Sequence, residues 1–165
     1  MTPLSPPLGN GEIRFWRLDA ERFASGWASG EGSFRAGGRW NSAGVRAVYA
    51  ALDPATSTLE VAVHKGFLVL DTQPHILTSA QVIDPATVAV IWPQDVPNPN
   101  WLTPGIPSRN QQLFGDALLA RHRFVLIPSA VSRHSWNLMF DATKPVADYA
   151  DVTQERFALD PRLQA

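Results

Sequence analysis

Short runs of β-favouring residues, separated by irregular loops, constrain the fold of this chain more than any other feature. These runs have strand length and are rich in apolar, β-branched and aromatic side chains: 13–18, 47–51, 76–83, 88–91, 124–127, 136–140 and 152–159. Only two helices are firmly indicated, one from Asp53-Pro54 to about Gly66-Phe67 and one from Ser108 to about Arg121, each with a good cap. Strands joined by loops, with few helices between them, predict a single α+β domain rather than a doubly wound parallel sheet.

Spacing and composition give further expectations for the helices and loops. Residues at helical spacing define the expected buried faces: Leu59, Val63 and Phe67 in the first helix, and Leu113, Ala117 and Ala120 in the second. Gly26 to Gly38 is rich in glycine and serine and is predicted to be a loop that could close over a ligand. Residues 93–107 are rich in proline and are predicted to form an irregular loop.

The composition excludes several classes of protein. At 165 residues, with 45% hydrophobic and 18% charged residues, the chain fits one ordinary globular domain. A net charge of −1 gives no overall basic field, so we expect no direct binding of nucleic acid. The absence of cysteine suits a reducing cytoplasm, and no apolar stretch is long enough to span a membrane. Residues 1–12 are expected to be a loose leader without the pattern of a signal peptide, followed by one domain over 13–163.

A turn with an unusual set of polar and aromatic side chains is the first candidate for a ligand site. Gly37-Gly38 permits a sharp turn and a close approach of the backbone to a ligand. Arg39 then supplies a planar fork for phosphate, Trp40 a flat stacking face and Asn41 an amide.

A second set of residues is expected to complete the site. Tyr49 lies in the next predicted strand, and Glu60 and His64 share a face of the first helix, where the alternative is a solvent-exposed pair. Ser129 directly follows a predicted strand, where a serine is otherwise a turn or cap residue. Arg17 is one of two arginines on opposite faces of the first strand, so one of them can point inward rather than remain at a solvated edge.

Familiar catalytic and metal-binding motifs are missing from the sequence. The four histidines show no HExxH or comparable spacing, so we expect no metal. No GxSxG, GxxxxGK[ST] or GxGxxG pattern is present, which argues against a serine hydrolase of that type, a phosphate loop and a dinucleotide-binding Rossmann site.

Several motifs in a fixed order resemble those of the RES domain family. They are Phe15-Trp16-Arg17, Gly-Gly-Arg-Trp-Asn-Ser-Ala-Gly at 37–44, Val48-Tyr49-Ala50, Leu59-Glu60, Gly115-Asp116, Val-Leu-Ile-Pro-Ser at 125–129 and Phe-Ala-Leu-Asp-Pro-Arg-Leu at 157–163. The resemblance covers about residues 13–163, and the combination is more specific than any one motif. It implies a fold like that of ADP-ribosyltransferase toxins and the activity of a type II toxin that consumes NAD+. It also implies an Xre-like antitoxin as partner, which we expect to cover the active site.

The resemblance also implies which residues act. The family's arginine, glutamate and serine fall on Arg39 (or Arg17), Glu60 and Ser129. Arg39 with Arg17 is expected to hold the pyrophosphate of NAD+, and Glu60 to stabilise the positive charge that develops on the ribose. Ser129 is expected to orient that ribose.

The other candidates have supporting roles in this interpretation. Nicotinamide is expected to stack on Tyr49 or Trp40, with Asn41 nearby. His64 is expected to orient Glu60 or to deprotonate the incoming nucleophile.

Two questions stay open at this level. The acceptor of ADP-ribose is a host protein side chain, phosphate or water, and each uses the same first step. Relatives commonly read Asn-Leu-Leu-Ile-Asn-Pro-x-His-Pro where this chain has Asn-Leu-Met-Phe-Asp-Ala-Thr-Lys-Pro at 137–145. That departure leaves an alternative, a non-catalytic nucleotide-binding or protein-interaction domain of the same fold.

Overall fold

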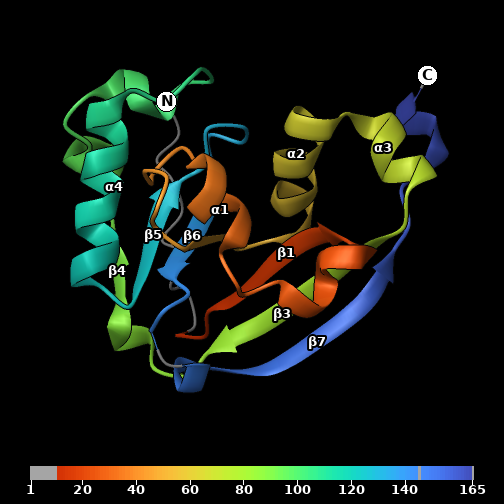
Figure 1. The fold of residues 1–165 in the computed structure, drawn as a ribbon, viewed down its shortest axis with the longest axis horizontal. Coiled ribbons are helices and arrows are strands. Elements are labelled where there is room, and N and C mark those ends of the chain that lie inside the picture. The colour runs from red at the N-terminus through yellow and green to blue at the C-terminus, as the bar shows by residue number, and fades with distance from the viewer. Residues whose placement is uncertain (1–10, 145, 165) are drawn as a thin grey trace.

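One mixed sheet organises the chain in the computed structural model, which describes residues 11–144 and 146–164. Within those residues the sheet has seven strands in the order β4-β5-β6-β2-β1-β3-β7 (Figure 1). Their bounds are β1 Arg14–Ala20, β2 Ala47–Ala51, β3 His75–Val82, β4 Val88–Val90, β5 Phe124–Pro128, β6 Trp136–Asp141 and β7 Tyr149–Phe157. Only β4 and β5 pair in parallel, and the other neighbours are antiparallel. The α+β prediction is confirmed.

Four α-helices accompany the sheet in the described residues: α1 Glu31–Ala36, α2 Pro54–Lys65, α3 Phe67–Thr72 and α4 Arg109–Arg121. Helix α2 packs over β1, where Leu18, Ala62 and Leu70 form a small core. Helix α4 lies over β5 and β6, with Leu119 in a core that includes Val125. A larger core includes Phe15 and Phe140. Its side chains alternate along the strands with those of the two smaller cores, so it lies on the opposite face of the sheet.

The sheet is nearly divided in two between β2 and β1. A single residue pair, Trp16 with Ala51, joins these strands, whereas β1 and β3 pair along the full length of β1. The strands therefore diverge beyond that pair, and side chains rather than backbone groups can bridge the opening. Figure 1 shows β4, β5 and β6 on the left and β1, β3 and β7 on the right, with α2 above β1.

The predicted strands and helix starts correspond closely to the observed ones. Asp53 caps α2, because its carboxylate accepts a hydrogen bond from the Thr56 amide at 2.7 Å. The Ser108 hydroxyl likewise accepts from the Gln111 amide at 3.2 Å at the start of α4. The last strand begins at Tyr149 and ends at Phe157, so its predicted range of 152–159 was shifted towards the C-terminus.

The predicted buried faces of both long helices were wrong. Leu59 and Val63 are 39% and 60% exposed, and Leu113 is 46% exposed, while Ala117 and Ala120 are also exposed. Most of the buried positions are small or polar instead, namely Thr56, Ser57 and Ala62 in α2 and Gln111 and Gly115 in α4. Leu119 of α4 is the large apolar residue among them. Small side chains face inward because both helices approach the rest of the protein closely.

The segment from Gly26 to Gly38 was predicted as a loop but contains α1. Gly30 adopts the left-handed conformation, with φ of 62°, and starts the helix at Glu31. The Glu31 carboxylate then pairs with Arg35 at 2.7 Å and with Arg46 at 2.5 Å. These ion pairs fasten α1 to the chain before β2. Of the predicted leader, residues 1–10 lie outside the described residues, and Gly11 and Glu12 are exposed.

Candidate functional site

The structure brings Glu60 and Ser129 together from positions 69 residues apart. The Ser129 hydroxyl donates a hydrogen bond of 3.0 Å to Glu60 Oε1. Glu60 lies on the middle of α2 and is partly exposed, whereas Ser129 is 1% exposed at the end of β5. Two of the residues selected from the sequence therefore form one polar pair, with the serine fixed and the carboxylate open to solvent.

A tight turn after β5 fixes the Ser129 hydroxyl. Its oxygen accepts hydrogen bonds from the amides of Val131 at 3.2 Å and Ser132 at 3.1 Å. The backbone N–H of Ser129 donates to the carbonyl of Ser135 at 2.9 Å, which closes the turn. Because the oxygen is already an acceptor twice, its proton is directed to Glu60. The turn thus orients Ser129 as a donor to the carboxylate.

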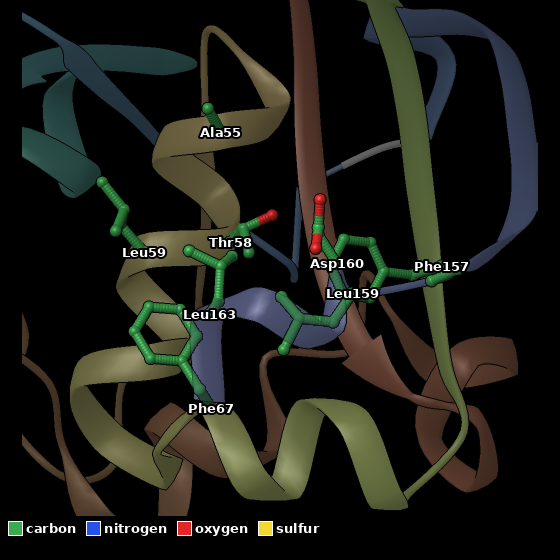
Figure 2. A pocket seen from close by; sticks show the side chains of 9 residues that line it. Ala55, Thr58, Leu59, Phe67, Phe157, Leu159, Asp160 and Leu163 are labelled. Atoms are coloured by element: carbon green, nitrogen blue, oxygen red, sulfur yellow. The ribbon is translucent and has the colours of Figure 1, made fainter. Parts of the chain in front are cut away.

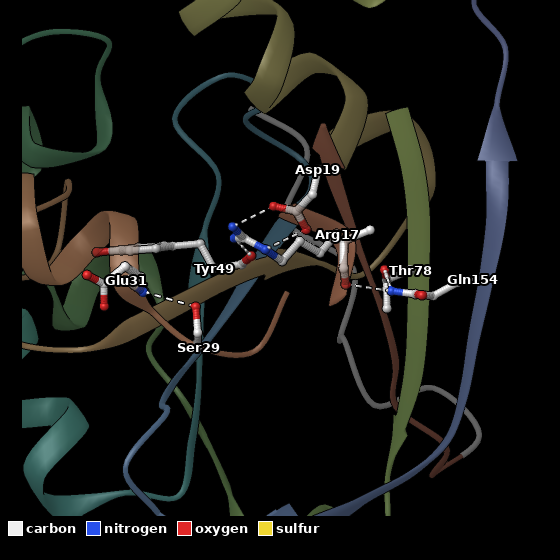
Figure 3. Close-up of polar contacts among 8 residues, drawn as sticks. Arg17, Asp19, Ser29, Glu31, Tyr49, Thr78 and Gln154 are labelled. Carbon is white, nitrogen blue, oxygen red and sulfur yellow. Dashed lines mark hydrogen bonds and ion pairs between the residues drawn. The ribbon is translucent and has the colours of Figure 1, made fainter. Parts of the chain in front are cut away.

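Arg17 bridges the opening between β1 and β2 (Figure 3). Its Nε and Nη2 donate to the two oxygens of Asp19 at 3.0 Å and 2.9 Å, and its Nη1 donates to the Tyr49 carbonyl at 2.8 Å. The Arg17 side chain keeps 31% exposure. Sequence reasoning missed Asp19, although its spacing of two residues from Arg17 places both side chains on one face of the strand. Arg17 is the arginine that contacts β2, whereas Arg14 contacts Ser79 of β3 and Asp151 of β7.

Tyr49 lies between that arginine and the glycine-rich turn. Its hydroxyl accepts a hydrogen bond from the Trp40 amide at 3.0 Å and donates to Asn41 Oδ1 at 2.7 Å. Burial raises the pKa of Tyr49, so the hydroxyl stays protonated at neutral pH. A Cβ on Gly38 would lie 2.9 Å from that hydroxyl oxygen. It would lie still closer, 2.6 Å, to Asn41 Oδ1, so the close approach that Gly38 permits is to the Asn41 and Tyr49 side chains.

Trp40, Asn41 and Arg39 make contacts with the protein itself. Trp40 is 2% exposed and packs edge-on against Trp101 and Phe114, and Asn41 is fully buried. Arg39 donates to the carbonyls of residues 101, 103 and 105 at 3.4, 3.1 and 3.2 Å. A direct contact of Trp40 or Asn41 with a ligand would require the side chain to leave its buried position, whereas Arg39 is partly exposed.

His64 is exposed on α2, near its C-terminal end. Leu59, which precedes Glu60 in α2, lines a hollow of about 380 Å³ between α2 and the C-terminal residues (Figure 2). Its lining is largely apolar and includes Leu59, Phe67 and Leu163, but not Glu60. Figure 2 shows these side chains converging from α2, α3 and the chain end. The hollow is thus separate from the Glu60–Ser129 pair.

The hydroxyl of Tyr49 offers a direct test of how the turn is held. We expect Tyr49→Phe to lower the free energy of unfolding by about 1–3 kcal/mol, because it leaves the Trp40 amide without its acceptor. Chemical denaturation measures the change. Tyr149→Phe is the matched control, since its hydroxyl makes neither of these contacts. Equal stability of the two variants would contradict the assignment.

Two searches of the described residues exclude particular features. No cluster of three or more His, Cys, Asp or Glu side chains there has the arrangement of a metal site. No helix in the same residues has the length and apolar character needed to cross a membrane.

Comparisons with known proteins give consistent matches. The family model described as RES domain matches residues 14–160. The chain is 30% identical over 163 residues to the Prs ADP-ribosylating toxin of Sphingobium sp. (strain YBL2), covering 90% of this chain and 95% of that protein. It is 32% identical over 152 residues to Toxin Res of Pseudomonas putida, covering 90% of this chain and 97% of that protein.

A solved structure gives the same fold. The crystal structure of the M. tuberculosis MbcT–MbcA toxin–antitoxin complex superposes with a TM-score of 0.71, at 20% sequence identity, over 89% of this chain and 85% of that chain. At this identity the likeness establishes the α+β architecture.

Proposed function

The chain belongs to the RES domain family, and we propose on that basis that it is the toxin of a toxin–antitoxin pair and consumes NAD+. Its curated relatives carry the names Prs ADP-ribosylating toxin and Toxin Res. The observation that carries the proposal is the contact between Glu60 and the fixed hydroxyl of Ser129. This pair is where the family's glutamate and serine fall in the sequence.

The proposed first step breaks the bond between nicotinamide and ribose. The bonding electron pair leaves with the nicotinamide nitrogen, which neutralises its positive charge, and positive charge develops on the ribose. The Glu60 carboxylate stabilises that charge at short range, and its partial burial makes the interaction stronger than it would be in water. Because nicotinamide leaves as a neutral molecule, the step needs no strong general acid.

Arg17 is the cation that we assign to the pyrophosphate. Its contacts with Asp19 and Tyr49 use three of its five N–H groups, and one N–H remains on each Nη. A guanidinium with two free donors and 31% exposure suits a bidentate contact with phosphate oxygens. Arg39, the other candidate, donates to three carbonyls of the proline-rich loop and also keeps two N–H groups. We assign the principal contact to Arg17 because it lies on β1, the strand over which α2 packs with Glu60.

The second step transfers ADP-ribose to an acceptor. The nucleophile forms a bond to the same ribose carbon and loses a proton, and exposed His64 is the group that we assign to take it. A protein side chain is the acceptor suggested by the name of the Sphingobium relative, with phosphate and water as the other candidates. Mass spectrometry separates these three cases, because they give modified protein, ADP-ribose 1″-phosphate and free ADP-ribose.

The segment that departs from the relatives' pattern lies away from this pair. Lys144 Nζ donates to the carbonyls of Leu119 and His122 at 2.7 and 3.1 Å, at the C-terminal end of α4. Residue 141 ends β6, whereas the Ser129–Ser135 turn precedes its first residue. The alternative of a non-catalytic domain thus gains no support from the described part of this segment, 141–144.

The proposal is tested by incubating the purified protein with NAD+ and measuring nicotinamide release. Steady release above the uncatalysed rate supports it. If release equals that of buffer alone, the proposed activity is wrong.

An antitoxin that covers the site is the proposed partner. The MbcT–MbcA complex shows that a protein of this fold assembles with an antitoxin. We expect the neighbouring gene to encode a small helix-turn-helix protein of the Xre type that copurifies with this chain and suppresses nicotinamide release. Unchanged release in the purified complex would contradict coverage of the site.

A further inference from the structure

We propose that Asp19 is a positioning residue that holds Arg17 in the orientation needed to bind the pyrophosphate of NAD+. The inference rests on the proposed function and extends it to a residue that does not itself touch substrate. Asp19 binds Arg17 through the side formed by Nε and Nη2, at 3.0 and 2.9 Å. Two parallel hydrogen bonds of this kind fix the plane of a guanidinium as well as its position.

The opening in the sheet explains why Arg17 needs such a partner. A single pair joins β1 and β2, so Arg17 projects where the strands diverge and only the Tyr49 carbonyl meets it from β2. One hydrogen bond would leave the guanidinium free to rotate about that contact. The bidentate pair with Asp19 removes this freedom and leaves one N–H on each Nη for a ligand.

The surroundings of Asp19 indicate that folding does not favour its charged form. Its exposure is 9%, and burial raises the pKa of Asp19 even though Arg17 opposes the shift. Lys65 from α2 and His75 from β3 are the other charged or titratable groups that act on it, and both favour the carboxylate. A carboxyl whose pKa is raised on folding is one whose ionised form the folded state disfavours. Loss of this charge should therefore not unfold the protein.

His75 is a second buried titratable group that acts on Asp19. It is 1% exposed, and its Nδ1 lies 2.8 Å from the carbonyl of residue 73. Its Nε2 is buried without a hydrogen-bond partner among the described residues. A buried carboxyl with a raised pKa and a buried, incompletely bonded ring nitrogen both cost stability on β1 and β3, which are interior strands of the sheet. This loss of folding stability is consistent with a role of the cluster in binding.

The test measures binding of ADP-ribose, which carries the pyrophosphate but lacks the scissile bond. Asp19→Asn preserves the shape of the side chain and removes its charge. We expect its Kd for ADP-ribose in titration calorimetry to be about tenfold higher than that of the wild type, since one charge-assisted hydrogen-bonded pair is weakened. Its Tm is expected to be unchanged or higher. Asp19→Glu, which keeps the charge, is expected to recover part of the lost affinity.

Asp151→Asn is the matched control. Asp151 pairs with Arg14, the other arginine of β1, and is 67% exposed. Asparagine also tolerates the left-handed conformation of Asp151, with φ of 55°. We expect no change in Kd for this variant. Equal Kd values for Asp19→Asn and Asp151→Asn would overturn the inference, and so would a loss of affinity explained by unfolding of both Asp19 variants.

The pH dependence provides a readout that a purely structural role would not give. As the pH falls, protonation of Asp19 releases Arg17, so the Kd of the wild type should rise at a pH above the usual range for aspartate. This rise should be absent in Asp19→Asn. A wild type that releases no nicotinamide and binds no ADP-ribose refutes the proposed function. A wild type that does both, with the same pH profile as Asp19→Asn, refutes only the inference.

Discussion

Replacing Glu60 with glutamine is expected to lower the rate of nicotinamide release by about two to three orders of magnitude, as for other residues that stabilise charge in a transition state. Glutamine has nearly the same shape, and its amide oxygen can still accept the hydrogen bond from Ser129. The variant therefore removes the negative charge while preserving an acceptor for the Ser129 hydroxyl. Initial rates at saturating NAD+ measure the effect, because the lost interaction belongs to the transition state.

A second glutamate provides the control for this experiment. Glu155 is exposed on β7, at the edge of the sheet, and Glu155→Gln makes the same chemical change. We expect it to retain the rate of the wild type. Comparable rates for the wild type and Glu60→Gln would remove Glu60 from the reaction, whereas a large loss in both variants would point to a general effect of charge.

The distribution of apolar residues explains what sequence periodicity could and could not predict in α2. The helix begins where its cap predicted, but Leu59 and Val63 are exposed, while Val61 packs against the core beside β1. Leu59 lines the hollow near the C-terminal residues, and Ala62 meets the core beside Leu18. A helix with apolar contacts on two sides has no single stripe, so spacing alone selected the larger residues.

The Glu60–Ser129 pair could be selected from the sequence, but its geometry could not. The order of motifs indicated both residues, yet nothing local states that α2 and the end of β5 meet across 69 residues. The contacts of Arg39 could not be predicted for a related reason. An arginine after paired glycines is typical of a phosphate site, but the carbonyls of residues 101–105 that bind it come from a distant loop. Contacts between residues far apart in the sequence determine the positions of both the Glu60–Ser129 pair and Arg39.

Helix α4 holds the glycine-rich turn in place, and Gly115 is the residue that permits this contact. A Cβ at Gly115 would lie 1.8 Å from the Trp40 carbonyl oxygen, far inside any allowed contact. Two hydrogen bonds cross the same interface, from Gln112 Nε2 to the Gly38 carbonyl at 2.9 Å and from the Ser42 amide to Asp116 at 3.0 Å. Moving the helix away from the turn would weaken both hydrogen bonds and displace the Trp40 amide, which donates to the Tyr49 hydroxyl.

We therefore expect Gly115→Ala to lower the free energy of unfolding by about 3 kcal/mol, at the upper end for overpacking of a core, because the contact is with rigid backbone. For a domain of this size the corresponding fall in Tm is about 6–12 °C. Gly32→Ala in α1 is the matched control, since a Cβ there meets nothing within 4 Å. That control is expected to be neutral or to gain about 0.5 kcal/mol from a more restricted unfolded chain. Similar melting curves for the two variants would show that α4 can shift away from Trp40 at little cost, and the turn would then depend on Tyr49 and Asn41 alone.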